Sequence, residues 1–213
     1  MGATVTRVDG LDTEPVVAAR DWRDVLRDAT DLALVGATVV LASVPVFTAG
    51  AAVGTASAAV HDWAETGSWP SARRTLGRFG RAVLPGTAVT ALTLLVVGIL
   101  VADLLALAAG RVPGGIPALL VTVAATLALA GHAALVVVEV GRSGGVGWRS
   151  AARSAARTCL ARPGTWAALA GVVLLTGLLT LMIHPVAAVL LAGYAIAALH
   201  AVARRTAGRK ETT

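Results

Sequence analysis

The chain has 213 residues and a formal net charge of +6, with 56% hydrophobic and only 14% charged residues. A soluble domain carries about 45–50% apolar and about 25% charged residues, so the composition excludes an ordinary soluble domain. The single cysteine, Cys159, excludes an intramolecular disulfide framework and a cysteine-based zinc site. The charges are also absent from long stretches. Together these features predict an all-α protein, a polytopic transmembrane helical bundle with interfacial cationic helices.

The chain begins with a polar segment, residues 1–28. This segment mixes acids with arginines and lacks the order of basic, apolar and cleavage regions that is typical of a signal peptide. We expect a single membrane domain to follow over residues 29–203. A basic cytoplasmic tail over residues 204–213 then ends the chain.

The first apolar stretch, residues 32–60, is too long for one ordinary crossing and is interrupted by Pro45 and Gly50. Proline removes a helical hydrogen bond and clashes with the preceding turn, so a helix break is expected there. Two arrangements remain open: one crossing, or a short hairpin, re-entrant if its turn sits at depth. A non-helical turn at membrane depth should be covered by other helices.

Four further apolar stretches follow, and each has the length of a single crossing, since about 20 helical residues cross the hydrocarbon once. They are residues 83–109, 116–138, 165–183 and 185–202.

The positions of the 18 lysines and arginines favour the hairpin. Basic residues concentrate on the cytoplasmic side of short loops. With a hairpin at residues 32–60, every basic residue except Arg111 falls on the cytoplasmic side, whereas a single crossing would put the N-terminal arginines outside. We therefore expect a multi-pass protein of the plasma membrane with both termini cytoplasmic. The positive-inside bias also explains the net charge, so no nucleic acid partner is expected.

A short pattern occurs twice, 79 residues apart, and divides the chain into units. Trp69 and Trp148 each begin it, and serine, alanine and two arginines follow at the same offsets. A weaker echo begins at Trp22. Each copy precedes a membrane stretch on the same side, so the pattern predicts three parallel units, residues 22–66, 69–140 and 148–203.

The arginines of the two copies recur at helical spacing, which predicts amphipathic helices lying in the membrane interface. One interpretation is that they only anchor the orientation of the chain. The other is that they also contact anionic lipid or a partner protein. The residues concerned are Arg74, Arg78, Arg81, Arg149, Arg153 and Arg157.

The order of these segments resembles the YesL-like family of bacterial integral membrane proteins, whose function is unknown. The resemblance rests on residues 45–52 after the first apolar stretch, on the segment from Trp69 to Phe79, and on the segment from Arg149 to Pro163. It covers roughly residues 20–203. The chain departs from the family at His61-Asp62-Trp63, where a more apolar or basic segment is usual. The resemblance implies a multi-spanning protein, with some relatives encoded beside carbohydrate ABC transporters, and it implies no catalytic residues.

Ionisable residues inside a membrane are candidates for function. Asp103, His132 and Glu139 lie within or beside the spans, but their spacing along the helices predicts isolated polar groups and no proton relay. We expect Asp103 to be an interfacial carboxylate or a partner of Arg111. His132 is expected to bond a neighbouring helix, or else to line a polar path for a substrate. His200 is expected to face the lipid headgroups.

Two further patterns carry no cofactor or metal. Residues 141–147 are glycine-rich but lack the spacing of a dinucleotide loop and follow a membrane span. His61, Asp62 and Glu65 have no fourth ligand for a metal. We therefore expect no catalytic, cofactor-binding or metal-binding residues.

The function expected from the sequence is that of a non-enzymatic accessory or assembly partner of a membrane complex. By the resemblance, that complex is a carbohydrate ABC transporter, with its permease as the partner beside the lipid bilayer. The alternative is a small-molecule transporter or channel.

Overall fold

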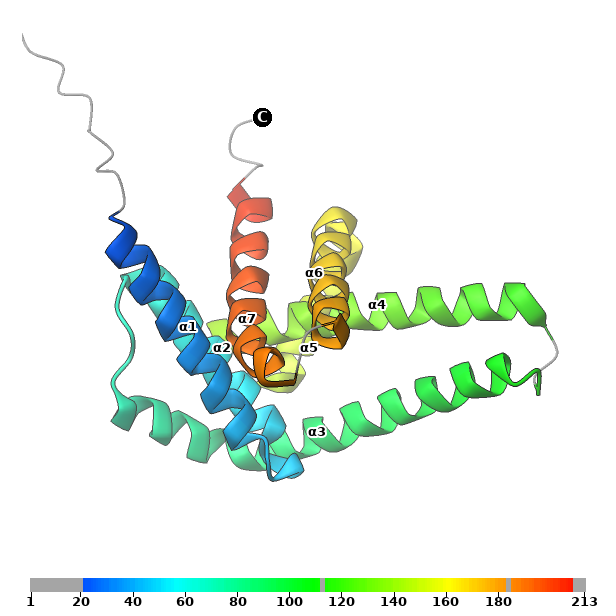
Figure 1. The fold of residues 1–213 in the computed structure, drawn as a ribbon, viewed down its shortest axis with the longest axis horizontal. Coiled ribbons are helices and arrows are strands. Elements are labelled where there is room, and N and C mark those ends of the chain that lie inside the picture. Colours follow the sequence, from blue (N-terminus) through cyan, green and yellow to red (C-terminus); the bar gives the residue numbers. More distant parts are fainter. Residues whose placement is uncertain (1–20, 112–113, 183–184, 209–213) are drawn as a thin grey trace, which may run out of the picture.

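The computed structural model describes residues 21–111, 114–182 and 185–208, without the side chains of residues 185–188 and 207. Every regular element in these ranges is helical, which confirms the all-α helical bundle (Figure 1). Most of the polar N-terminal segment and residues 209–213 of the tail lie outside the description. The elements are α1 (Trp22–Ala42), the 3-10 turn η1 (Val46–Thr48), α2 (Ala49–Thr66), α3 (Ala72–Ala108), α4 (Gly115–Arg142), α5 (Trp148–Ala161), α6 (Pro163–Met182) and α7 (Pro185–Gly208).

Three helices in the described part of the chain, α3, α4 and α6, are long and apolar enough to cross a membrane. They contain residues 83–108, 116–138 and 165–182 of the second, third and fourth apolar stretches. The fifth stretch, residues 185–202, forms most of α7, which continues to Gly208, so the first residues of the predicted tail are helical.

The first apolar stretch is broken where the sequence predicts. α1 ends at Ala42, and after η1 the chain reverses into α2 at Ala49. Pro45 stands directly before η1, where its missing N–H is not needed by a helix.

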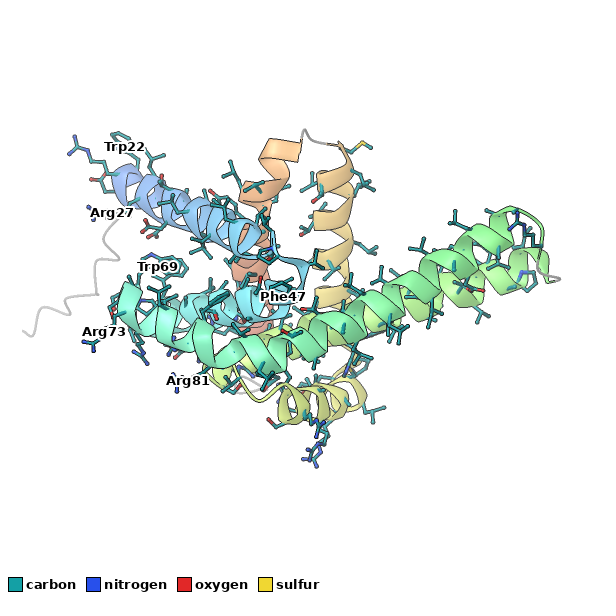
Figure 2. All side chains as sticks on the ribbon, turned by 90° about the horizontal axis from the view of Figure 1, so that it is seen from below. Trp22, Arg27, Phe47, Trp69, Arg73 and Arg81 are labelled. Carbon is teal, nitrogen blue, oxygen red and sulfur yellow. The ribbon has the colours of Figure 1, made fainter. Side chains whose placement is uncertain are left out.

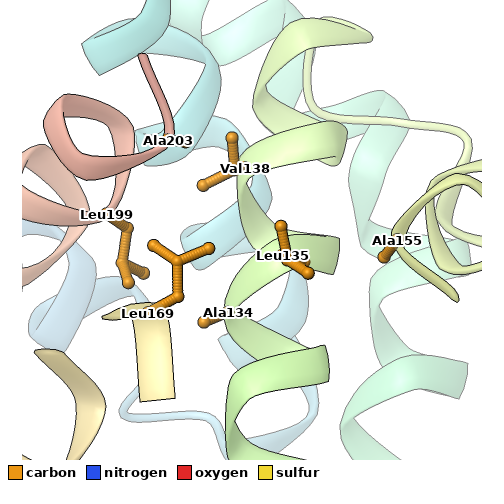
Figure 3. Close-up of a cluster of buried hydrophobic side chains, with 7 residues drawn as sticks. All are labelled: Ala134, Leu135, Val138, Ala155, Leu169, Leu199 and Ala203. Atoms are coloured by element: carbon orange, nitrogen blue, oxygen red, sulfur yellow. The ribbon is translucent and has the colours of Figure 1, made fainter. Parts of the chain in front are cut away.

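α2 is the centre of the bundle and packs against α1, α3, α4 and α7. Its residues from 50 to 60 are almost all alanine, glycine, serine or threonine, and all but one of them are buried. Small side chains let neighbouring helix backbones approach closely. Two apolar clusters complete the core, one around α2 with Val60 and Ile196, and one around α4 with Leu135, Val138 and Leu169 (Figure 3).

Glycines occupy the points where helices cross most closely. A Cβ at Gly36 of α1 would lie 2.6 Å from the carbonyl oxygen of Val189 on α7, and Gly193 faces it from α7. Gly50 of α2 meets Gly86 of α3 in the same manner. These crossings are backbone against backbone and leave no room for a larger residue.

The two copies of the repeated pattern fold differently. In the second copy, α5 ends before Arg162, whose non-helical backbone (φ −140°, ψ 71°) precedes Pro163, the first residue of α6. In the first copy, the cationic segment and the apolar stretch form one uninterrupted helix, α3, with Pro85 inside it. The sequence predicts an interfacial helix in both places, and only α5 is a separate helix. Figure 1 shows that α3 bends in its first half, the part that contains Pro85, as a missing helical hydrogen bond allows.

The far halves of α3 and α4 form a projecting arm (Figure 1). Leu95, Ile99, Leu105 and Leu120 are among its many exposed apolar side chains. In the most apolar window of α3, none of the side chains is buried by the rest of the chain. We call this part, residues 91–108 and 115–125, the α3–α4 arm.

The crossing of α1 and α7 gives a first prediction. Gly36→Ala should destabilise the protein by about 1–3 kcal/mol, because the added methyl group forces two backbones apart. Thermal unfolding in detergent measures this loss. The control is Gly98→Ala on α3, where a Cβ meets open space, and we expect this change to leave stability the same or higher. Equal effects of the two changes would contradict the close crossing.

Candidate functional site

The candidate functional site is the set of arginines near the start of α3 and along α5. Five of the six predicted contact residues have exposed side chains, and we call them the exposed arginine set: Arg74, Arg81, Arg149, Arg153 and Arg157. On α5 they lie opposite Ala151 and Ala155, which are buried where α5 packs on neighbouring helices. The helical spacing thus separates a buried alanine face from a cationic face.

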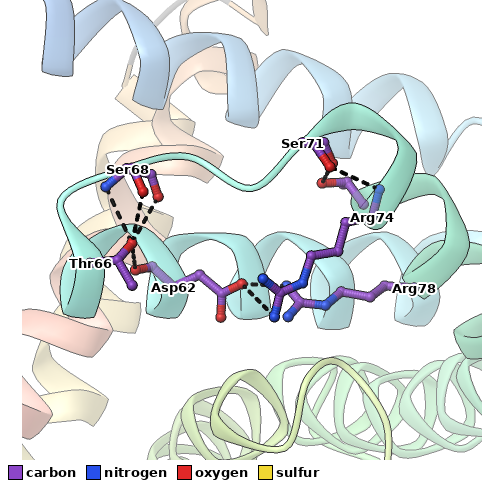
Figure 4. Close-up of polar contacts among 7 residues, drawn as sticks. Asp62, Thr66, Ser68, Ser71, Arg74 and Arg78 are labelled. Atoms are coloured by element: carbon purple, nitrogen blue, oxygen red, sulfur yellow. Dashed lines mark hydrogen bonds and ion pairs between the residues drawn. The ribbon is translucent and has the colours of Figure 1, made fainter.

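Arg78 differs from the other five because it is only 7% exposed. Its Nη1 lies 2.8 Å from Asp62 Oδ2 on α2, and Arg74 Nη2 lies 3.6 Å from the same oxygen (Figure 4). The contact between Arg78 Nη1 and Asp62 Oδ2 is an ion pair, and its angles do not meet those of a hydrogen bond. A buried guanidinium needs a counter-charge, so Asp62 ties the end of α2 to the start of α3. The prediction of Arg78 as an outward contact residue is therefore wrong.

Aromatic and polar groups surround this ion pair. The rings of Trp63 on α2 and Trp69 stack with centroids 5.2 Å apart. Ser71 caps α3 by accepting a hydrogen bond from the N–H of Arg74. A polar hollow of about 330 Å³ lies beside them, lined by Asp62, Thr66, Ser68, Trp69, Pro70, Ser71 and Arg74. Because an acid and a base share its wall, the hollow is close to neutral, unlike the open cationic face of α5.

The tryptophan of the second copy, Trp148, also packs against α2. A Cβ built at Gly54 would lie 3.1 Å from the Trp148 ring. Both repeated tryptophans therefore pack against the same central helix, one near its end and one near its middle. Both tryptophan side chains are partly buried against protein.

The same C-terminal end of α2 is also held by α7. Arg204 donates a hydrogen bond of 2.8 Å to the carbonyl oxygen of Ala64, and its guanidinium lies 3.9 Å from Glu65. A cation at a helix C-terminus is favoured by the helix dipole. Among the described residues, no three of His, Cys, Asp and Glu come together to hold a metal ion.

His200 is buried, at 2% exposure, and does not face headgroups as predicted. Ser57 Oγ donates a 2.7 Å hydrogen bond to the carbonyl of Val137 and lies 2.9 Å from His200 Nε2. Because the hydroxyl proton of Ser57 is donated to the Val137 carbonyl on α4, the N–H of His200 Nε2 donates to the Ser57 oxygen. This is the reverse of the arrangement that activates a serine nucleophile. The contact pins α2, α4 and α7 together, and His61 stacks on the His200 ring.

His132 contacts a neighbouring helix, as one of the two predictions has it. Its Nδ1 lies 3.8 Å from Cys159 Sγ on α5. Burial raises the pKa of the Cys159 thiol, and a contact with its own backbone partly offsets this. A groove of about 850 Å³ runs between α4, α6 and α7, but His132 does not line it and its walls are mostly apolar.

The remaining polar candidates are also paired. Thr122 on α4 donates a 2.7 Å hydrogen bond to Asp103 Oδ2 and so links the two helices of the arm. Arg142 donates to Glu139 one turn away on the same helix. In the loop before α5, Gly144, Gly145 and Gly147 take positive φ angles, and Gly145 approaches the backbone of Gly54. The glycines therefore make a tight turn against α2.

Sequence reasoning missed the role of Asp62, and a signal was present. Arg74 and Arg78 are one turn apart, and two acids, Asp62 and Glu65, precede them just after the first apolar stretch. Ser57 gave no signal, because a serine among alanines is ordinary in a closely packed helix.

No family model, no curated protein and no solved structure matches this chain. The geometry of its own residues is therefore the basis for any functional conclusion.

The ion pair between α2 and α3 gives a second prediction. Asp62→Asn should destabilise the protein by about 3–5 kcal/mol, because it leaves a buried guanidinium without its counter-charge. Unfolding in detergent, followed by tryptophan fluorescence, measures this. Glu65→Gln is the matched control, since its ion pair with Arg204 is exposed and contributes about 0–1 kcal/mol. A loss for Asp62→Asn no larger than the control would contradict the structural role.

The partly buried thiol of Cys159 gives a third prediction. Only the thiolate reacts with maleimide, so the raised pKa of Cys159 lowers its thiolate fraction at any given pH. Its alkylation rate should rise at a higher pH than that of an exposed cysteine on the same helix. Ala156→Cys in a Cys159→Ala background supplies that control, because residue 156 is exposed. Coincident rate profiles against pH would contradict the burial.

Proposed function

We propose that this chain is an integral membrane protein that serves as a non-enzymatic accessory or assembly partner of a membrane complex. The observation that carries the proposal is the α3–α4 arm. A pair of long apolar helices extends beyond the rest of the bundle, and no side chain in the most apolar window of α3 is buried by the chain itself. Such a surface needs lipid or another membrane protein against it.

The positions of the basic residues support an orientation of the α3–α4 arm relative to the membrane. In Figure 2, Arg27, Trp69 and Arg73 lie at the end of the molecule opposite the tip of the arm. Basic residues favour the cytoplasmic leaflet, and each contributes about 1 kcal/mol of attraction near anionic lipid. We propose that the exposed arginine set lies on the cytoplasmic face of the plasma membrane, that the chain is multi-pass, and that both termini are cytoplasmic.

The chemistry of the buried polar groups supports a role without catalysis. Ser57, His200, Asp62 and Arg78 are engaged with one another or with backbone across helix contacts. These pairings hold helices together. The resemblance of the sequence to YesL-like proteins, some of them encoded beside carbohydrate ABC transporters, suggests the permease of such a transporter as the partner.

Purification in mild detergent after cross-linking in native membranes tests this function. We expect the same permease to be recovered with the unaltered chain and with Arg153→Lys, and to be lost after Leu95→Ser and Ile99→Ser in the arm. Cross-linked peptides should map to α3 or α4. The proposal fails if no permease is recovered and the protein alone moves a solute across liposomes in a manner abolished by His132→Ala. That result would establish the transporter alternative.

A further inference from the structure

The turn between α1 and α2 carries an unusual combination of exposed apolar side chains and hydrogen-bonded backbone. Val44 is 72% exposed, Val46 56% and Phe47 58%. These three side chains are not covered by other helices, contrary to the expectation for a turn at depth. An irregular turn in water normally exposes polar side chains and leaves its backbone to the solvent.

Several backbone groups in and beside this turn are bonded by threonine hydroxyls. Thr48 Oγ1 reaches the carbonyl oxygens of Ala42 and Pro45, and the Thr48 N–H also donates to Pro45 at 2.8 Å. Two threonines of α3 complete the set. Thr87 Oγ1 lies 3.1 Å from the carbonyl oxygen of Phe47 and also contacts its own helix.

Thr90 supplies the next contact along α3. The N–H of Gly50, in the first turn of α2, donates to Thr90 Oγ1 at 2.8 Å, and this hydroxyl donates in turn to the carbonyl of Gly86. The first N–H groups of a helix have no partner within the helix, so a hydroxyl from outside is needed where water is absent. In a bilayer core, backbone groups without such partners are not tolerated.

The length of the hairpin sets its depth. From Leu32, after the last acid of α1, to Val44 the chain extends about 20 Å, and from Ala49 to Val60 it returns about 18 Å. Both arms are shorter than the hydrocarbon core, which is about 30 Å thick. The first hairpin therefore cannot carry its turn across a bilayer.

The position of the turn along α3 agrees with this depth. Thr87 and Thr90, which hold the turn, lie about 9–14 Å beyond Arg81, the last basic residue of α3. α3 then continues for about 27 Å to Ala108. In Figure 2, Phe47 accordingly lies between the arginine end of the molecule and the tip of the arm.

We infer that α1 and α2 form a re-entrant hairpin, whose tip at Val44 to Phe47 is inserted in the acyl-chain region of the bilayer and returns to the arginine side. The inference rests on the membrane location in the proposed function. The occupant of the exposed tip is lipid hydrocarbon, since the side chains are apolar and the threonines of the turn and of α3 bond the carbonyls of Ala42, Pro45 and Phe47, which hydrocarbon cannot solvate. The hairpin thus anchors the centre of the bundle, α2, from one side of the membrane.

Single cysteines in a Cys159→Ala background test the inference in proteoliposomes. Asp24→Cys and Ser68→Cys, both exposed at the two ends of the hairpin, should react with a membrane-impermeant maleimide from the same side. Phe47→Cys should react from neither side. A fluorophore attached at Phe47→Cys should be quenched most strongly by lipid spin-labelled in the acyl chain, and less by lipid labelled at the headgroup.

Three results would overturn the inference: labelling of Asp24→Cys and Ser68→Cys from opposite sides, labelling of Phe47→Cys by the impermeant reagent, or strongest quenching by the headgroup label. Val46→Cys repeats the depth measurement if the Phe47 variant does not fold. A chain that does not enter liposomes at all contradicts the proposed membrane location itself, which separates the two failures.

The threonine contact has its own comparison. Thr87→Val removes the hydroxyl that bonds the Phe47 carbonyl, so the site of strongest quenching should shift towards the headgroups. Thr93→Val, an exposed threonine farther along α3, is the control and should leave the depth unchanged. Equal depths in both variants would show that the hydroxyl does not support insertion.

Discussion

The arrangement of the molecule depends on how closely helix backbones approach α2. A helix of small residues has little apolar area of its own to bury, so its stability in the bundle comes from contact with four neighbours at once. Glycines on the facing helices, such as Gly86 and Gly141, remove the side chains that would hold them apart. Short distance then makes the polar contacts of Ser57 and Asp62 geometrically available. The buried ion pair and the serine–histidine contact are consequences of the close packing and lock its register.

Much of the fold can be predicted from the sequence because it depends on local composition. Runs without charge predict the helices, and Pro45 predicts the break between α1 and α2, since its effect on the backbone needs no knowledge of neighbours. Proline alone does not decide such a break. α6 begins at Pro163, whereas Pro85 lies inside α3, because a proline within a long apolar helix can be accommodated by a bend.

The site is less predictable because burial of a charged or polar side chain depends on residues far away in the sequence. Arg74 and Arg78 have the same residue type and the same helical face, yet only Arg78 reaches the inside of the bundle. His200 lies near two arginines in the sequence and for that reason resembles a headgroup contact. What buries it is α2, some 140 positions earlier, and no local pattern carries that information.

The uninterrupted course of α3 has a mechanical consequence. Because one helix runs from the ion pair with Asp62 to the far end of the arm, a displacement of its basic end is transmitted along it as through a lever, with the bend at Pro85 as the point of flexure. α5 is separated from α6 by the non-helical residue Arg162, so no continuous helix links its arginines to α6. The two copies of one sequence pattern therefore differ in their connection: the first forms one helix with the arm, and the second is interrupted before the helix that follows it.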